Sequence, residues 1–152
     1  MSAFNSASNE QLVQKLREAG VRPSSARIYV MRYLEEMRDH PTVDQIYKVL
    51  RRRLPSLSRT SVYNALSTLR EAGLVRPFSM DGNETLYDAN ILDHGHFRCT
   101  HCGRIYDFDV KLPEAEQIEL KGFKTYRRDV LLWGLCPICA EKPECENIKS
   151  IN

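Results

Sequence analysis

Two pairs of cysteines constrain this chain more than any other feature of its sequence. Cys99 and Cys102 are separated by two residues, and Cys136 and Cys139 repeat that spacing. The short gap lets both sulfurs of a pair converge on one ion, and two such pairs complete a closed, tetrahedral zinc site of the structural type. A redox role is less favoured, because the same motif occurs twice. We therefore expect zinc to hold the segments around both pairs together.

The first half of the chain is predicted to be a winged helix-turn-helix domain, residues 1–87. Apolar residues recur at helical spacing in four segments. The residues that cap or end these helices are Ser24 or Ser25, Thr42 and Ser58 at the starts, and Gly20 and Gly73 at the ends. Two short strands, 74–79 and 84–87, follow around a turn at Asp81-Gly82-Asn83. Helices followed by a β-hairpin are typical of DNA-binding domains.

The second half, residues 88–152, is predicted to be a small α/β module that forms the dimer and senses metal. Strand-like stretches lie at 96–99, 104–110 and 123–135, with a helix at 113–120 and a loose polar tail after Lys142. The four cysteines fall in this module, so zinc is expected to join the strand near Cys99 to the end of the stretch at 135. The fold class of the whole chain is therefore α+β.

Charge is distributed unevenly between the two halves. Residues 1–80 carry a net +6 and residues 81–152 a net −4, which sum to the overall +2 of this chain of 152 residues. A basic first half favours a polyanionic partner, although two unrelated solvated surfaces would also produce such a difference. No segment has the profile of a signal peptide or the length of a membrane span, so we expect a cytoplasmic protein.

The helix that begins after Ser58 offers a polar face of the kind that reads DNA. Its apolar stripe leaves hydrogen-bonding and basic residues on the opposite side. The candidate DNA-binding residues are Arg59, Thr60, Tyr63, Asn64, Ser67 and Arg70. The arginines at 17, 22 and 51–53 are candidates for phosphate contacts. The alternative is a solvated helix face with Tyr63 packed against its own domain.

Histidines and carboxylates form a second candidate metal site. His94 and His96 are two residues apart, so on a strand both rings point to one face. Asp107 follows on the returning strand, Asp88 lies at the junction of the halves, and His40 precedes the third helix. Nitrogen and oxygen ligands without thiolate favour Fe(II), Mn(II) or Zn(II). Each residue alone also has an ordinary structural role: a cap, a strand end or a solvated charge.

The chain resembles the ferric uptake regulator (Fur) family. The matching motifs, in one order over roughly residues 10–140, are Gly20-Val21-Arg22 with Arg27, His40-Pro41-Thr42 with Ile46-Tyr47, Ser61-Val62-Tyr63-Asn64 with Leu66, Ala72-Gly73-Leu74-Val75, His94-Gly95-His96-Phe97, Cys99-Thr100-His101-Cys102-Gly103 and Gly134-Leu135-Cys136-Pro137-Ile138-Cys139. Aspartate at positions 88 and 107 makes the chain most similar to the peroxide-sensing (PerR) branch of the family.

This resemblance implies a homodimeric repressor of operator DNA, with a structural Zn²⁺ on the four cysteines. It also implies a regulatory site for Fe²⁺ or Mn²⁺, whose ligands are His40, Asp88, His94, His96 and Asp107. In the PerR branch, hydrogen peroxide oxidises a ligand histidine of the iron form, and the corresponding positions are His40 and His94. Metal bound by both halves would set the spacing of two recognition helices on DNA.

Three other functions remain open from the sequence. A sensor of the same family could respond to iron, zinc or manganese without peroxide chemistry. The His/Asp site could activate water in a metalloenzyme, although a recognition helix in a basic half argues against an enzyme. A zinc-containing interaction module is the third. For the favoured function we expect no membrane partner and no small-molecule substrate, with peroxide acting only as a signal.

Overall fold

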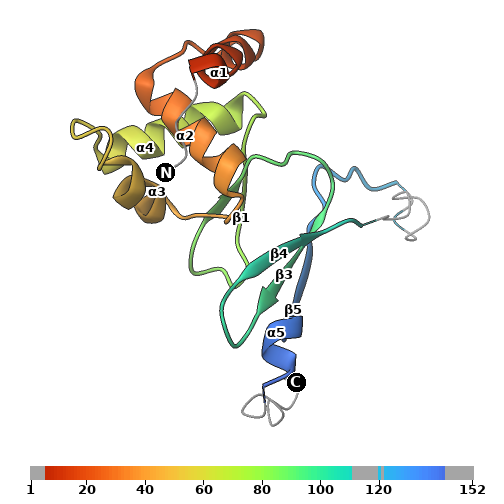
Figure 1. Ribbon diagram of the computed structural model, residues 1–152. Helices are drawn as coiled ribbons and strands as arrows, with labels where there is room; N and C mark the ends of the chain where they lie inside the picture. The colour runs from red at the N-terminus through yellow and green to blue at the C-terminus, as the bar shows by residue number, and fades with distance from the viewer. Residues whose placement is uncertain (1–5, 111–119, 121, 143–152) are drawn as a thin grey trace. The chain divides into compact units, whose positions relative to one another are not determined.

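The chain forms two compact units, residues 1–91 and 92–152. The computed structural model describes residues 6–110, 120 and 122–142. In chain order the elements are α1 Ser6–Glu18, α2 Ser25–Met37, α3 Val43–Leu50, α4 Arg59–Glu71, β1 Arg76–Phe78, β2 Leu86–Asp88, β3 Gly95–Cys99, β4 Ile105–Phe108, β5 Val130–Gly134 and α5 Pro137–Ala140 (Figure 1). The predicted α+β class is confirmed. Among the helices in these ranges, none combines the length and the apolar character that a membrane span requires.

Side chains cap three helices of the first unit at the residues expected from the sequence. The Ser24 hydroxyl accepts a hydrogen bond from the backbone N–H of Arg27, which starts α2. Thr42 and Gln45 form a reciprocal capping box at the start of α3, with the Gln45 side chain 2.8 Å from the Thr42 nitrogen. Ser58 caps α4. Each cap satisfies an N–H that the helix leaves without a backbone partner, so helix starts are legible in local sequence.

The four helices enclose one apolar core. On α4 the buried residues are Val62, Ala65, Leu66 and Leu69, at the spacing of one helix face. Burying a leucine completely contributes about 1.5–3 kcal/mol, so this stripe determines which side of α4 faces inward. Gly73 ends the helix at φ +70, a left-handed conformation that glycine adopts without strain.

A two-stranded wing completes the first unit. β1 and β2 pair antiparallel, with Phe78 opposite Leu86 and Arg76 opposite Asp88. The turn expected at residues 81–83 lies within a longer connection, where the Gly82 N–H donates to the Ser79 hydroxyl at 2.8 Å. Four helices and a wing give the predicted winged helix-turn-helix architecture.

The second unit contains a three-stranded sheet in the order β4-β3-β5. β3 is central, pairing antiparallel with β4 and parallel with β5. Its cluster of buried core residues among those described consists of Cys99, Cys136 and Cys139, with three partly buried apolar side chains packed against it. A core this small gains much of its cohesion when a metal joins its sulfurs.

The second unit differs from the sequence expectation in two places. The stretch predicted to be extended over 123–135 is a strand only at 130–134, because β3 begins at Gly95, the partner of Val130. Before that point an ion pair between Arg128 and Asp93, at 3.1 Å, takes the place of ladder pairing. The short helix α5 was not predicted. The helix expected at 113–120 lies almost wholly outside the described residues, as does the tail after Lys142.

Candidate metal centres and nucleic-acid interface

The four paired cysteines converge on one point in the second unit. Their sulfurs lie within 4.8 Å of one another, and those of Cys102 and Cys136 are 3.9 Å apart. Sulfurs 2.3 Å from a tetrahedral zinc ion are separated by about 3.8 Å. The end of β3 supplies Cys99, and the start of α5 supplies Cys136 and Cys139. These separations are close to those that a tetrahedral zinc ion requires.

Hydrogen bonds favour the thiolate form at two of these sulfurs. Burial alone would raise the pKa of Cys99, yet backbone N–H groups, among them those of Cys102 and Cys136, hold that pKa to about 6. The hydroxyl of Tyr106 is the main cause of a lowered pKa at Cys136. Zinc binds thiolates, so these donors prepare the site for metal. Sequence reasoning missed Tyr106, because nothing local marks a β4 tyrosine as a neighbour of Cys136.

Two histidines and an aspartate meet at the other end of the same sheet. His94 and His96 project to one side of β3, with their Nε2 atoms 3.1 Å apart. On β4, Asp107 lies opposite His96 of β3, and its Oδ1 lies 3.8 Å from the Nε2 of His94 and 3.7 Å from that of His96. The Nδ1 of His94 lies 2.7 Å from the Leu92 carbonyl oxygen. A carbonyl only accepts, so Nδ1 carries the proton and Nε2 presents a lone pair, the tautomer that a metal ligand needs.

Gly95 gives this end of the sheet a close packing that sequence reasoning also missed. A Cβ at residue 95 would lie 2.3 Å from Cζ of Phe108, the residue opposite it on β4. Only glycine therefore lets the Phe108 ring pack against the backbone at residue 95, on the face of β3 opposite the two histidines. The signal was present in the His94-Gly95-His96 motif, but the partner ring lies on another strand.

His40 and Asp88 form a second pair of possible ligands, within the first unit. Both are buried, and the His40 Nε2 lies 3.7 Å from the Asp88 Oδ2. His40 has a left-handed backbone, φ +51, which is uncommon for a residue other than glycine. The adjacent Pro41 carbonyl accepts from the Tyr87 N–H at 3.1 Å, and the His40 ring meets Phe78 edge-on. Strained backbone held by such contacts is often found at functional sites.

The expected regulatory ligands thus occur as two groups, one in each unit. The first unit brings His40 and Asp88 together, and the second brings together His94, His96 and Asp107. His101, in the first cysteine turn, is exposed, as expected of a residue outside both sets.

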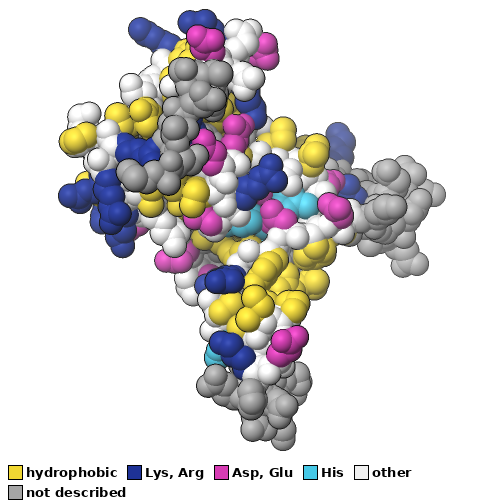
Figure 2. Space-filling model, in the orientation of Figure 1, with side chains coloured by type: hydrophobic (Ala, Val, Ile, Leu, Met, Phe, Trp, Pro, Cys, Tyr) yellow, Lys and Arg dark blue, Asp and Glu magenta, His cyan; other side chains and the backbone are white. Residues whose placement is uncertain are grey.

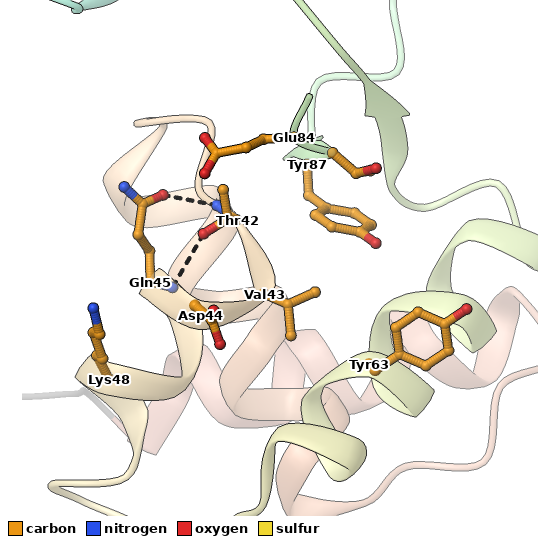
Figure 3. A pocket seen from close by; sticks show the side chains of 9 residues that line it. Thr42, Val43, Asp44, Gln45, Lys48, Tyr63, Glu84 and Tyr87 are labelled. Atoms are coloured by element: carbon orange, nitrogen blue, oxygen red, sulfur yellow. Dashed lines mark hydrogen bonds between the residues drawn. The ribbon is translucent and has the colours of Figure 1, made fainter. Parts of the chain in front are cut away.

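α4 exposes most of the residues expected to contact DNA. Five of the six candidates are exposed and one, Ser67, is half-buried; the exposed ones are Arg59, Thr60, Tyr63, Asn64 and Arg70. Tyr63 is 58% exposed, which argues against packing within its own domain. It borders a hollow of about 550 Å³ whose other walls come from the start of α3 and from β2 with the loop before it (Figure 3). Figure 2 shows basic side chains gathered over the part of the first unit that carries α3 and α4.

Comparison with known proteins shows which family and which relatives the chain is similar to. The model of the ferric uptake regulator family matches residues 18–132. The peroxide operon regulator of Bacillus subtilis is 35% identical, over 88% of this chain and 94% of its own. The peroxide-responsive repressor PerR of Staphylococcus epidermidis is 33% identical, over 88% and 91%. The crystal structure of the Campylobacter jejuni peroxide stress regulator is 28% identical, covers 86% of this chain and 97% of its own, and superimposes with a TM-score of 0.60. With its winged helix, its cysteine cluster and this extent of similarity, the chain belongs to the ferric uptake regulator family.

Proposed function

We propose that this protein is a metal-dependent repressor that binds operator DNA as a homodimer and releases it on exposure to hydrogen peroxide. The observation that carries the proposal is the donor set of His94, His96 and Asp107, in a chain whose relatives of similar length are named as peroxide-responsive regulators. Three nitrogen and oxygen donors at one end of the sheet suit Fe(II) or Mn(II).

The four-cysteine cluster has a separate, structural role in this proposal. Four thiolates fill the coordination sphere of zinc and leave no position for a substrate. Cys99 and Cys136 lie at the ends of elements distant in sequence, so zinc joins those elements within the small buried core that the cysteines themselves form. The sulfurs themselves need not react for the protein to respond to a signal.

The regulatory ion takes ligands from both units, namely His40, Asp88, His94, His96 and Asp107. These ligands couple the orientation of the winged helix to the dimerisation unit. In a homodimer that orientation determines the distance between the two α4 helices, which must match the spacing of DNA half-sites. The ion favours the DNA-binding arrangement only to the extent that it binds that arrangement more tightly.

When bound by these residues, iron would supply the redox chemistry that activates hydrogen peroxide. A ring carbon of His40 or His94 would exchange its C–H bond for a bond to one peroxide oxygen, and the other peroxide oxygen would leave as water, so that peroxide is reduced and the ring is oxidised. The modified ring is a poorer donor, so the ligand set loses a member and the units lose their fixed orientation. The Leu92 carbonyl keeps the His94 ring in place throughout, because its hydrogen bond involves Nδ1 and not the ligand atom.

A DNA-binding titration tests the proposal. The full-length protein is titrated onto operator fragments with Fe(II) or Mn(II), each with and without peroxide. We expect DNA binding to be lost only with iron plus peroxide. The mass spectrum should then show one added oxygen on a peptide that contains His40 or His94. Metal-dependent binding that persists in the presence of peroxide, without any added oxygen, would indicate a metal sensor of the same family that lacks peroxide chemistry.

Replacing single ligands adds a control within the same experiment. His40→Ala should abolish metal-dependent DNA binding and leave the dimer intact, whereas His101→Ala, at an exposed histidine, should bind as the parent does. Metal-dependent binding that persists in His40→Ala would refute the shared ion.

A further inference from the structure

An arginine at the start of the recognition helix is held by an acidic residue of the preceding helix. The Nε of Arg59 lies 3.1 Å from the Oδ1 of Asp44 in the first turn of α3. Both side chains remain more than half exposed, 62% for Arg59 and 55% for Asp44. Exposed ion pairs of this kind are weak, so a stronger anion can replace the carboxylate at little energetic cost.

An aromatic ring holds the same arginine by a second, independent contact. The Arg59 guanidinium lies 5.6 Å from the ring centre of Tyr47, within cation–π range. Arg51, the residue that caps the C-terminal end of α3, has its guanidinium 5.6 Å from the centre of the same ring. Because both guanidinium groups lie 5.6 Å from one ring centre, the distance between them is at most twice that value. Asp44, Tyr47 and Arg51 share one face of α3 at helical spacing.

The surroundings indicate which anion replaces Asp44. Arg51, Arg52 and Arg53 are all exposed, and four residues beyond Arg59 on α4 comes the exposed Tyr63. A guanidinium that offers several N–H donors to a planar or tetrahedral oxyanion binds phosphate well. A duplex DNA backbone presents such phosphates in series beside the bases that α4 would read.

We propose that Asp44 is an internal substitute for a DNA phosphate, which holds Arg59 in the free protein and yields it to the backbone on binding. Tyr47 keeps the guanidinium in position in both states, because the ring contact does not compete with the oxyanion for N–H groups. Asp44 thereby lowers affinity for DNA in general and limits binding at sites that offer few other contacts. This inference rests on the proposed DNA-binding function and adds a residue that opposes it.

A double-mutant cycle isolates the contact. Affinity for a generic DNA duplex is measured by fluorescence anisotropy for the parent protein, Asp44→Asn, Arg59→Gln and the double variant. Asp44→Asn should tighten binding by about 1.5- to 5-fold, the range expected for releasing one exposed ion pair. Arg59→Gln should weaken binding, and in its presence Asp44→Asn should have an effect below about 1.5-fold. Thermal unfolding of each variant verifies that the helices remain folded.

Glu84→Gln is the matched control. Glu84 lines the same hollow as Asp44 (Figure 3) and makes no ion pair among the residues that the structure describes. Glu84→Gln therefore removes the same charge as Asp44→Asn without releasing an arginine. An equal effect of the two substitutions, or an Asp44→Asn effect that survives in Arg59→Gln, would overturn the inference in favour of general charge repulsion. An unchanged affinity with a lower melting temperature would make the pair a structural link between α3 and α4.

Comparison with and without Mn(II) separates this inference from the proposed regulation. Asp44 and Arg59 both belong to the first unit, so the ratio between variant and parent should be the same in either condition. Metal-independent DNA binding with that ratio preserved would contradict the regulatory proposal alone. A ratio near one in both conditions, in a protein whose binding does respond to metal, would contradict only the role of Asp44.

Discussion

Replacing Gly95 with alanine should disrupt the regulatory ligands while leaving the zinc site intact. The new Cβ would lie 2.3 Å from Cζ of Phe108 and 2.7 Å from both Cε atoms, well short of ordinary carbon–carbon contact at about 3.5 Å or more. The ring must leave the strand, or β4 must move away from β3. Either change disturbs the pair next along the ladder, His96 and Asp107.

The structure allows the size of this effect to be estimated. Overpacking of this kind costs about 1–3 kcal/mol, and each kcal/mol lowers the melting temperature of a unit this small by roughly 4–8 °C. Displacing a residue that orients metal ligands typically lowers metal affinity by about 10- to 100-fold. We expect both changes in Gly95→Ala, measured by thermal unfolding and by Mn(II) titration of the zinc-loaded protein.

Two further variants make the reasoning refutable. Leucine lacks Cζ and both Cε atoms, so Gly95→Ala combined with Phe108→Leu should recover much of the Mn(II) affinity. Gly134→Ala, where the nearest ring atom of Phe97 is 3.2 Å from the added Cβ, should be milder and should spare the Mn(II) site. Mn(II) affinity within twofold of the parent in Gly95→Ala alone would show that this contact does not position the ligands.

Three other outcomes follow from the same structure. Cys99→Ser should lose zinc and destabilise the second unit, as measured by metal content and thermal unfolding; a stable, zinc-free dimer would count against a structural zinc. Tyr106→Phe removes the hydroxyl that lowers the pKa of Cys136, so zinc transfer to a chelator should be about 10-fold faster or more, and an unchanged rate would show the hydrogen bond to be unimportant. Burial, and then the Asp39 carboxylate, raise the pKa of Tyr33, so the folded unit favours the neutral phenol. Its stabilising contribution is complete below about pH 10, where the phenol is neutral in the unfolded chain too, and is lost as pH rises further. Tyr33→Phe should flatten that loss in alkaline unfolding curves, and curves that stay parallel would assign the loss to another group.

The sequence alone was sufficient wherever the physical cause is local. A serine or threonine hydroxyl reaches an N–H three residues away, so Ser24, Thr42 and Ser58 identified helix starts without any tertiary information. The repeated cysteine spacing was equally informative, since a two-residue gap brings two sulfurs to one ion whatever surrounds them. The alternation of strand side chains likewise placed His94 and His96 on one side of β3.

Tertiary structure decided everything that depends on which strand or helix lies beside which. The parallel pairing of β5 with β3 shortened the stretch predicted over 123–135, because a strand needs a partner along its whole length. Phe108 over Gly95 and Asp44 against Arg59 are contacts between segments whose own sequences do not mark them. Such contacts depend on the packing of the whole unit, where many weak interactions act together, and no short stretch of residues contains that information.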